Sequence, residues 1–256
     1  MPNASSPEFL DRYRRHILMK NIGGVGQKKL CNANILLIGM GGIGSASIQY
    51  LAGAGVGNIG IVDQDTVALS NLQRQTIYKY NDIGKKKVEV VSRFVRELNN
   101  NVKIEKYDFF IDNPKSAEVI SKYDLILDGT DNVKSRIEIN KACIRYEKPL
   151  IFGGVSGWEG TISFLLKDGA PCYECIFPNI EDNSNEPNCN SEGVLGAITA
   201  LVGSYMAAET IKYICSTGNI LTNKLLIIDI LNGCFEVFSA ERNVKCLACS
   251  KKYEHL

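Results

Sequence analysis

Four of the nine cysteines form two C-x-x-C pairs, Cys172 with Cys175 and Cys246 with Cys249. The two thiolates of such a pair can bind one metal ion, and two pairs complete the tetrahedral four-thiolate site that zinc prefers. Four protein ligands leave no position open for a substrate, so the pattern predicts a zinc with a structural role. A redox C-x-x-C or free thiols are the alternatives, but we expect neither pair to open a helix after a strand, as thioredoxin-type motifs do.

A glycine-rich segment that follows an apolar run could bind a phosphate. It reads Gly39-Met-Gly-Gly-Ile-Gly44 and leads into a stretch of small residues. In a strand–turn–helix unit, Gly39 permits the tight turn, Gly41 beside Gly42 lets a phosphate approach the backbone, and Gly44 lets the helix pack closely. The helix N-terminus then offers unpaired N–H groups and a positive dipole end to an anion. The segment therefore predicts a nucleotide site, rather than a glycine turn kept only for packing.

Polar residues after the next apolar run extend this candidate site. Asp63 lies about 20 residues beyond Gly44, where a carboxylate can accept hydrogen bonds from ribose hydroxyls. An enzyme that acts on a triphosphate needs cations to hold the phosphates and a carboxylate to hold Mg²⁺. A dehydrogenase needs neither. For each residue alone, ordinary surface polarity is the competing explanation. The candidates are Asp65, Asn71, Arg74, Gln75, Lys87, Asp131 and Asn132.

These residues need a scaffold that brings distant parts of the chain together. The alternation of apolar runs and helical segments predicts an α/β fold, with a Rossmann-like, doubly wound and mostly parallel sheet. Ligands of such sheets bind at the carboxyl ends of the strands, where Gly39, Asp63 and Asp131 are all expected. The expected strands are 35–38, 59–62, 102–107, 125–128 and 149–155, and the expected helices are 45–54, 82–99, 114–121 and 132–146.

The two ends of the chain flank this core, and we expect a single domain over residues 1–256. An N-terminal helical segment over about 7–30 should break near 23–26, and the core should span about 34–155. The C-terminal part, about 156–256, predicts antiparallel strands at 161–167, 225–229 and 234–238, the last two joined by a turn at Asn232-Gly233. It also predicts a polar loop over 178–192 and a helix over 194–215.

Composition excludes several classes of protein. The net charge of +1 provides no global field that would attract nucleic acid or a membrane surface. No apolar run is long enough to cross a bilayer, and residues 1–8 lack the apolar core of a signal peptide. We therefore expect a cytoplasmic protein with no nucleic-acid or membrane partner.

Taken in order, several motifs resemble the ThiF/MoeB/HesA family of adenylyltransferases, which are similar to the core of ubiquitin-activating enzymes. The motifs are the glycine turn, Leu69-Ser-Asn-Leu-Gln-Arg-Gln75, Lys87, Thr130-Asp-Asn132 and the two C-x-x-C pairs, and the resemblance extends from Arg12 to Cys249. Two departures are His16, where the family usually has Gln, and Gly129, where it usually has Cys.

The resemblance implies roles for the nucleotide-site residues. Asp63 would bind the ribose, Asn71, Arg74 and Lys87 would hold the triphosphate, and Asp131 would bind Mg²⁺. The four paired cysteines would bind Zn²⁺.

Two further roles come from the resemblance alone. Arg15 would reach the ATP of the partner subunit in a homodimer, although its position in a basic cluster favours a solvated helix cation. Cys189 matches a reactive cysteine, because the string 188–194 resembles thiamine-pathway members more than molybdopterin ones.

The expected activity is ATP-dependent adenylylation of the C-terminal glycine carboxylate of a ubiquitin-like sulfur-carrier protein. No rhodanese-like extension is visible, so we expect a separate sulfur donor, a desulfurase or a rhodanese. A relative that adenylates a peptide or a tRNA group remains an alternative. Two alternatives from other classes are an NAD-dependent Rossmann oxidoreductase and a non-catalytic zinc adaptor.

Overall fold

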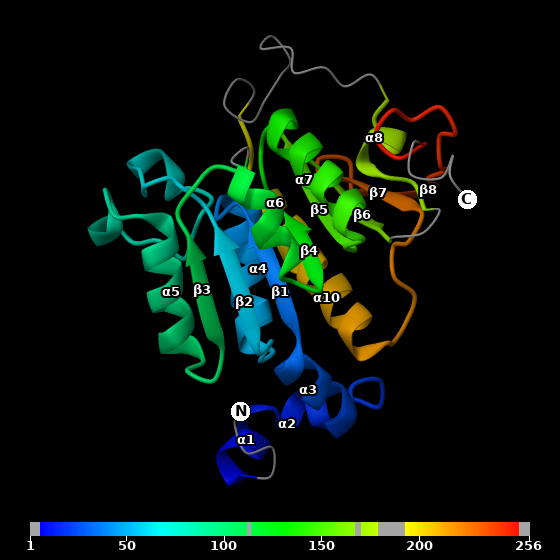
Figure 1. Cartoon of the computed structure of the whole chain (residues 1–256). Helices are drawn as coiled ribbons and strands as arrows, with labels where there is room; N and C mark the ends of the chain where they lie inside the picture. Colours follow the sequence, from blue (N-terminus) through cyan, green and yellow to red (C-terminus); the bar gives the residue numbers. More distant parts are fainter. Residues whose placement is uncertain (1–5, 112–113, 167–169, 179–192, 251–256) are drawn as a thin grey trace.

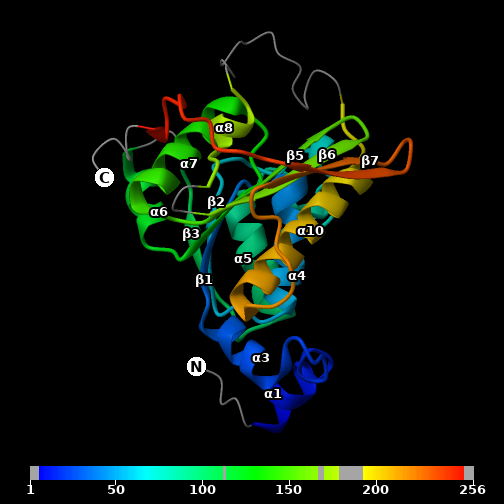
Figure 2. The ribbon, with the colours of Figure 1, turned by 90° about the vertical axis from the view of Figure 1, so that its right-hand side faces the viewer.

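An eight-stranded sheet runs through the molecule (Figures 1 and 2). The computed structural model describes residues 6–111, 114–166, 170–178 and 193–250. Its strands are β1 (Asn34–Ile38), β2 (Asn58–Val62), β3 (Lys103–Tyr107), β4 (Leu125–Asp128), β5 (Leu150–Ser156), β6 (Glu159–Leu165), β7 (Lys224–Asp229) and β8 (Cys234–Ser239). They lie in the order β3-β2-β1-β4-β5-β6-β7-β8, parallel from β3 to β5 and antiparallel from β5 to β8. The expected α/β fold with C-terminal antiparallel strands is confirmed.

Helices cover both faces of the sheet, as Figure 2 shows. One face carries α4 (Gly42–Gly53), α5 (Lys87–Leu98) and α10 (Gly196–Cys215), and the other carries α6 (Pro114–Ser121) and α7 (Val133–Tyr146). The short helices α1 (Pro7–Arg12) and α2 (Arg14–Ile17), with α3 (Gly23–Asn32), lie below the sheet in Figure 1, and α8 (Tyr173–Ile176) lies near its top. Two 3₁₀ turns, η1 (Leu69–Asn71) and η2 (Tyr80–Asp82), connect β2 to α5.

The apolar run of β1 explains why the sheet needs helices on both sides. Successive side chains of a strand point to opposite faces. Ile35 and Leu37 accordingly join the core beneath α4, α5 and α10, whereas Leu36 and Ile38 join the core beneath α6 and α7. All four are buried. A strand buried on both faces is typical of a parallel sheet covered on both sides.

Close packing between α4 and α10 fixes the glycine turn against the rest of the molecule. A Cβ added at Gly203 would lie 2.8 Å from the Cβ of Ala46, so the two helices approach closely at a residue without a side chain. The hydroxyl of Ser47 donates a hydrogen bond to the carbonyl of Gly203 at 2.9 Å. The start of α4 therefore has little freedom to move.

Several boundaries differ from the sequence expectation. Helix α5 begins at Lys87 rather than near 82, because 80–82 form a 3₁₀ turn and Gly84 takes a left-handed conformation with φ of +83°. The N-terminal segment breaks before Gly23 instead of within 23–26, since Gly23, with φ of +60°, starts α3. The expected turn at Asn232-Gly233 is confirmed by the β7–β8 hairpin.

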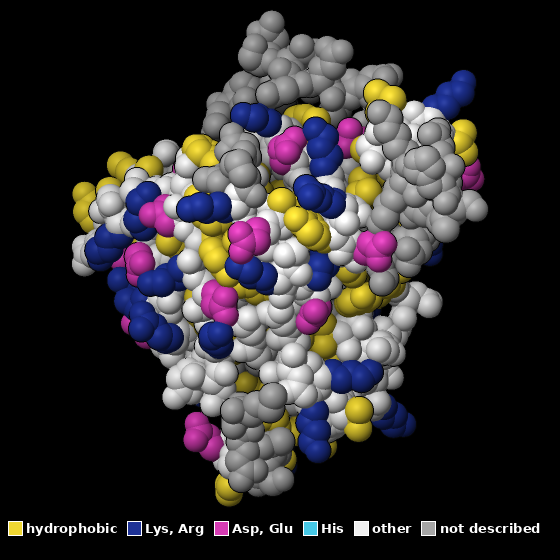
Figure 3. Space-filling model, in the orientation of Figure 1, with side chains coloured by type: hydrophobic (Ala, Val, Ile, Leu, Met, Phe, Trp, Pro, Cys, Tyr) yellow, Lys and Arg dark blue, Asp and Glu magenta, His cyan; other side chains and the backbone are white. Residues whose placement is uncertain are grey.

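No helix among the described residues is both long and apolar enough to span a membrane. Acidic and basic side chains lie interspersed on the face of the molecule shown in Figure 3, where the Lys and Arg side chains are the more numerous, most clearly on the left.

Candidate functional site

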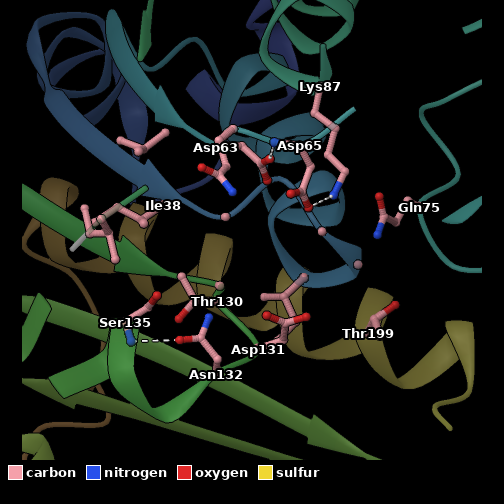
Figure 4. Close-up of a pocket in the computed structure, with 18 of the residues that line it drawn as sticks. Ile38, Asp63, Asp65, Gln75, Lys87, Thr130, Asp131, Asn132, Ser135 and Thr199 are labelled. Carbon is pink, nitrogen blue, oxygen red and sulfur yellow. Dashed lines mark hydrogen bonds and ion pairs between the residues drawn. The ribbon is translucent and has the colours of Figure 1, made fainter. Parts of the chain in front are cut away.

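A pocket lies at the carboxyl ends of β1, β2 and β4, the edge where the order of the parallel strands reverses. Ligands of doubly wound sheets bind at this point. Figure 4 shows side chains from the β2–α5 connection facing those of the β4–α7 turn across a common space. The lining includes most of the residues singled out in the sequence: Gly39, Gly41, Gly42, Asp63, Asp65, Asn71, Arg74, Gln75, Lys87, Asp131 and Asn132.

The glycine turn has the geometry that a phosphate requires. Gly39 takes a φ of +85°, and Gly41 is the N-cap of α4 without a capping side chain. A Cβ at Gly41 would have a single neighbour within 4 Å, the Nε2 of Gln75 at 3.8 Å, so space lies open above this backbone. The first N–H groups of α4 face that space with the positive end of the helix dipole.

Gly44 acts differently from the expectation. A Cβ there would overlap the carbonyl oxygen of Gly39, so the glycine is required by the turn itself rather than by packing of the helix on the sheet. A Cβ at Gly39 would lie 2.9 Å from the carbonyl oxygen of Gly129, and one at Gly129 would lie 3.2 Å from the N of Gly44. The turns after β1 and β4 are therefore in direct backbone contact.

Asp63 follows β2 and is held by two backbone groups. Its Oδ2 accepts a hydrogen bond from the N–H of Met40 at 2.7 Å, and its Oδ1 accepts one from the N–H of Asp65 at 2.8 Å. Burial raises the pKa of Asp63, and the charge of Lys87 and these two bonds oppose the increase. Each carboxylate oxygen keeps a further lone pair, which suits ribose hydroxyls.

Lys87, the first residue of α5, places a buried ammonium group at the pocket. Its side chain is 5% exposed, and its Nζ lies 2.8 Å from the Oδ2 of Asp65, as the dashed line in Figure 4 marks. The backbone N–H of Lys87 also donates to the carbonyl of Asp65 at 2.9 Å. The cation is therefore held in place before any anion binds.

The connection from η1 to Gln75 supplies an amide, a guanidinium and a second amide to the pocket. The Oδ1 of Asn71 accepts from the N–H of Ala68 at 3.0 Å, and Arg74 donates to the carbonyl of Ser70 at 3.1 Å. Gln75 is buried, and among the described residues no donor reaches its Oε1. A buried amide with an unmatched oxygen at the pocket fits a site that receives a polar ligand.

The turn after β4 presents Asp131 to the pocket. Asp128 is buried, and its Oδ1 accepts hydrogen bonds from the N–H and the hydroxyl of Thr130 at 2.9 and 2.7 Å. Asn132 caps α7 by accepting from the N–H of Ser135 at 2.8 Å, so its side chain also serves the helix. Asp131, between them, is exposed at the pocket edge and is a suitable carboxylate ligand for Mg²⁺.

Other lining residues were missed by sequence reasoning. Thr199 of α10 lies against Gly42, where an added Cβ would approach its side chain to 2.8 Å. Arg136, one helical turn after Asn132, also lines the pocket. The apolar segment 109–111 completes the lining, and its place immediately after β3 was a usable signal, because β3 is also a parallel strand of this sheet.

One predicted residue is not brought to the pocket of its own chain. Arg15 is exposed on α2, which packs on α3 below the amino end of β1, whereas the pocket lies at the carboxyl end of that strand. The chain that carries Arg15 therefore does not bring it to its own pocket. Cys189 lies outside the described residues, so its role stays a prediction.

The four paired cysteines form a buried cluster away from the pocket. All four Sγ atoms lie within 4.8 Å of one another, and the closest separations are 3.5 Å between Cys175 and Cys249 and 3.6 Å between Cys172 and Cys246. Sulfurs bound at about 2.3 Å to one tetrahedral zinc would be about 3.8 Å apart. Disulfides are excluded, since their S–S length is about 2.05 Å.

The surroundings of the cysteine cluster also favour a cation. Burial, with the neighbouring thiols, raises the pKa of Cys172, and a nearby cation would favour its thiolate. At Cys175 burial is outweighed by hydrogen bonds, mainly from backbone groups, which lower the pKa of that thiol. One expectation about these cysteines was wrong, because Cys172 is the N-cap of the short helix α8. Its backbone carbonyl accepts the N–H of Cys175 at 3.0 Å, which closes the C-x-x-C turn as one helical turn.

The pocket combines a phosphate-binding turn with balanced charge. Its lining contains three cationic side chains, those of Arg74, Lys87 and Arg136, and three carboxylates, those of Asp63, Asp65 and Asp131. Such an arrangement can neutralise a polyphosphate and hold its metal ion while a second anion approaches. A dinucleotide cofactor would make no use of Lys87 or Asp131.

Known proteins are similar to this one over most of the chain. The model of the ThiF family matches residues 13–248. A sulfur carrier protein adenylyltransferase from Thermus thermophilus is 36% identical over 247 residues, covering 94% of this chain and 91% of the relative. The SAMP-activating enzyme E1 of Haloferax volcanii is 38% identical over 243 residues, covering 94% of this chain and 89% of the relative.

Longer relatives also match. The adenylyltransferase and sulfurtransferase MOCS3 of Aedes aegypti is 38% identical over 240 residues, covering 93% of this chain, and the chain spans 55% of that protein's length. Among solved structures, that of E. coli MccB with MccA-N7isoASN superposes with a TM-score of 0.83 at 24% identity, covering 97% of this chain and 76% of MccB. At this identity the likeness supports the fold alone.

Proposed function

The chain belongs to the ThiF family, and on that basis we propose that it adenylylates the C-terminal carboxylate of a ubiquitin-like sulfur-carrier protein at the expense of ATP. The carrier's terminal carboxylate attacks the α-phosphate of ATP, pyrophosphate leaves, and an acyl-adenylate forms. The observation that carries the proposal is the meeting of the glycine turn, Arg74, Lys87 and Asp131 around one pocket. Relatives named for sulfur carrier adenylylation, aligned over nearly the whole chain, support the choice of substrate.

Each element of the pocket has a place in this reaction. The N–H groups at the start of α4 would bind a phosphate, and Arg74 and Lys87 would balance the charge that builds up as pyrophosphate leaves. Asp63 would hold the ribose through its two ordered carboxylate oxygens. Asp131 would hold Mg²⁺, which would neutralise phosphate charge. The attacking carboxylate is already ionised at pH 7, so no general base is needed.

We further propose that the enzyme is a homodimer in which Arg15 completes the pocket of the partner subunit. The support is positional, because Arg15 lies at the opposite end of the sheet from its own pocket. The exposed apolar side chains of Leu18, Met19 and Val25 near it would give such a dimer a surface to bury.

The remaining parts of the proposal concern partners and metals. The cysteine cluster would bind one structural Zn²⁺, since its Sγ separations fit a four-thiolate tetrahedron. Sulfur would come from a separate donor, a desulfurase or a rhodanese. We propose a cytoplasmic location, where such thiols stay reduced. A ubiquitin-like domain could dock on the outer strand β8, whose exposed Phe235, Val237 and Phe238 form an apolar edge.

The test is ATP–pyrophosphate exchange with purified chain, Mg-ATP and separate sulfur-carrier proteins of the thiamine and molybdopterin types. We expect exchange that depends on one carrier and disappears when its terminal glycine is deleted. Calorimetric titration should show that Mg-ATP binds and that NAD does not. Tight NAD binding without an ATP signal, or no exchange with any carrier, would contradict the proposal.

A further inference from the structure

One cationic side chain at the pocket has no part in the reaction derived above. Arg136 projects from the first turns of α7 and lines the pocket beside Thr130 and Asp131. It is half-buried. Its Nη2 donates two hydrogen bonds, one to the carbonyl oxygen of Thr130 at 2.8 Å and one to that of Gly153 at 3.0 Å. A single nitrogen thus joins the turn after β4 to the neighbouring strand β5.

The position of these two carbonyls explains why a long side chain is needed. The last residue of β4 is Asp128, which pairs with Phe152 of β5. Beyond this pair β4 turns away, while β5 continues through Gly153 to Ser156. The guanidinium of Arg136 lies alongside β5 where the next residue of β4 would otherwise lie. It therefore replaces strand pairing at the point where the catalytic turn begins.

The turn is held from both sides of Thr130. The buried carboxylate of Asp128 accepts hydrogen bonds from the N–H and the hydroxyl of Thr130. Arg136 donates a hydrogen bond to the carbonyl oxygen of the same residue. That carbonyl belongs to the peptide unit that leads into Asp131. Fixing this peptide unit fixes the N and Cα atoms of Asp131 and so limits the directions in which its side chain can leave the backbone.

The strand next to Arg136 leaves room for it. A Cβ at Gly154 would lie 3.0 Å from Nη1 of Arg136 and 2.8 Å from the hydroxyl of Thr161, so a side chain at this position would push the guanidinium away from β5. The positive charge of Arg136 also opposes the increase that burial causes in the pKa of Asp128. The two hydrogen bonds of Arg136, its charge near Asp128 and the space left by Gly154 are all consistent with a role in holding the turn on β5.

We propose that Arg136 is a positioning residue that holds the turn 129–132 on β5, so that the Asp131 carboxylate is kept in place for the metal ion of the bound nucleotide. The proposal rests on the proposed function for its metal, but the order of the turn can be measured without any activity. Side chains that orient a metal ligand change metal affinity by about 10–100-fold when they are replaced.

The first measurement is amide hydrogen exchange in the protein without nucleotide. In Arg136→Lys the charge remains, but the ammonium is one bond nearer the backbone and cannot span both carbonyls. We expect the amides of 129–132 to exchange at least about tenfold faster in this variant, and in Arg136→Met, than in the wild type. The matched control is Arg145→Lys, an exposed arginine on the same helix, which should leave these amides unchanged.

The second measurement is the Mg²⁺ dependence of carrier-driven pyrophosphate exchange. Arg136→Lys should raise the half-saturating Mg²⁺ concentration by about tenfold or more, with the rate at saturating Mg²⁺ within about threefold of wild type. Asp131→Asn should lose activity at all Mg²⁺ concentrations, because the ligand itself is missing. Gly154→Ala, which crowds the guanidinium, should resemble Arg136→Lys and serves if Arg136→Met does not fold.

The outcomes separate this proposal from the function it rests on. If the wild type catalyses no exchange with any carrier, the function fails, and hydrogen exchange still decides whether Arg136 orders the turn. Wild-type protection of 129–132 in Arg136→Lys would overturn the inference. So would an unchanged Mg²⁺ requirement combined with a raised KM for the carrier, because Arg136 would then contact the substrate instead.

Discussion

The Nζ of Lys87 lies 2.8 Å from the Oδ2 of Asp65, and the pair ties the first residue of α5 to the segment after β2. Lys87 is buried, whereas the Asp65 side chain is 56% exposed. The carboxylate therefore holds the ammonium at the pocket wall, where, in the function we propose, the triphosphate of ATP would replace it as the partner of Lys87.

The first prediction concerns this cation. Lys87→Met keeps most of the apolar part of the side chain and removes the ammonium group, so we expect pyrophosphate exchange to fall by about 100-fold or more, as when one donor to a developing charge is removed. Lys86→Met is the matched control, since Lys86 is exposed and pairs with Asp108. If Lys87→Met catalysed pyrophosphate exchange as fast as Lys86→Met, Lys87 would be excluded from the site.

The second prediction concerns zinc. Elemental analysis of protein purified without chelators should give one zinc per chain, and Cys249→Ser should lose it. Because metal binding contributes free energy of folding, Tm should fall by about 5 °C or more. Cys234→Ser, at an exposed cysteine outside the cluster, should change neither quantity. Metal-free wild-type protein, or an unchanged Tm in Cys249→Ser, would contradict the assignment.

The third prediction tests the shared site. Arg15→Ala and Lys87→Met should each be inactive alone. After subunit exchange of an equal mixture, half the dimers should be heterodimers, and each heterodimer should have one intact pocket. Activity should therefore return to about a quarter of the wild-type level. If the mixture remained at background, Arg15 would act within its own chain or not at all.

The fourth prediction concerns pH. Although burial acts in the opposite direction, hydrogen bonds from Arg93, Lys85 and the N–H of Lys79 lower the pKa of Asp82 below its usual value of about 3.9. A lowered carboxyl pKa in the folded state stabilises the protein above the unfolded-state pKa, and this contribution is lost as the pH falls through the folded-state value.

Asp82→Asn should therefore destabilise the protein at pH 7, and its difference from wild type should shrink below about pH 4. Urea unfolding of both proteins between pH 7 and 2.5 measures this difference. If the difference in the free energy of unfolding between the two proteins stayed constant with pH, the charge of Asp82 would contribute nothing to stability. Asp108→Asn serves as the control, because its ion pair with Lys86 is exposed and weak.

The parallel core and the pocket edge were predictable because strand ends can be read from apolar runs. Gly39, Asp63 and Asp131 each follow such a run, and the structure places all three around one pocket. The cysteine cluster was predictable from spacing, although 74 residues separate its two pairs. In each case a short sequence pattern, the end of an apolar run or a C-x-x-C pair, marks residues that the fold brings together.

Other features depend on tertiary contacts that no local pattern records. Arg136 is an ordinary arginine in a helix until β5 places the carbonyl of Gly153 beside it. The start of α5 was misplaced because the Asp82 side chain turns back to the N–H of Lys79, which favours a 3₁₀ turn over a helix. The role proposed for Arg15 requires a second subunit, so no contact within one chain marks it.

The backbone contact between the turns after β1 and β4 also limits how the protein can change by mutation. At Gly39 and Gly129 an added Cβ would press on the backbone of the other turn, and at Gly44 it would overlap the carbonyl oxygen of Gly39 in its own turn, so a side chain at any of the three positions would displace this backbone. An engineer who wants a different nucleotide should leave these glycines fixed and randomise the side chains of 109–111, which line the same pocket and are not among the close neighbours of the three glycines.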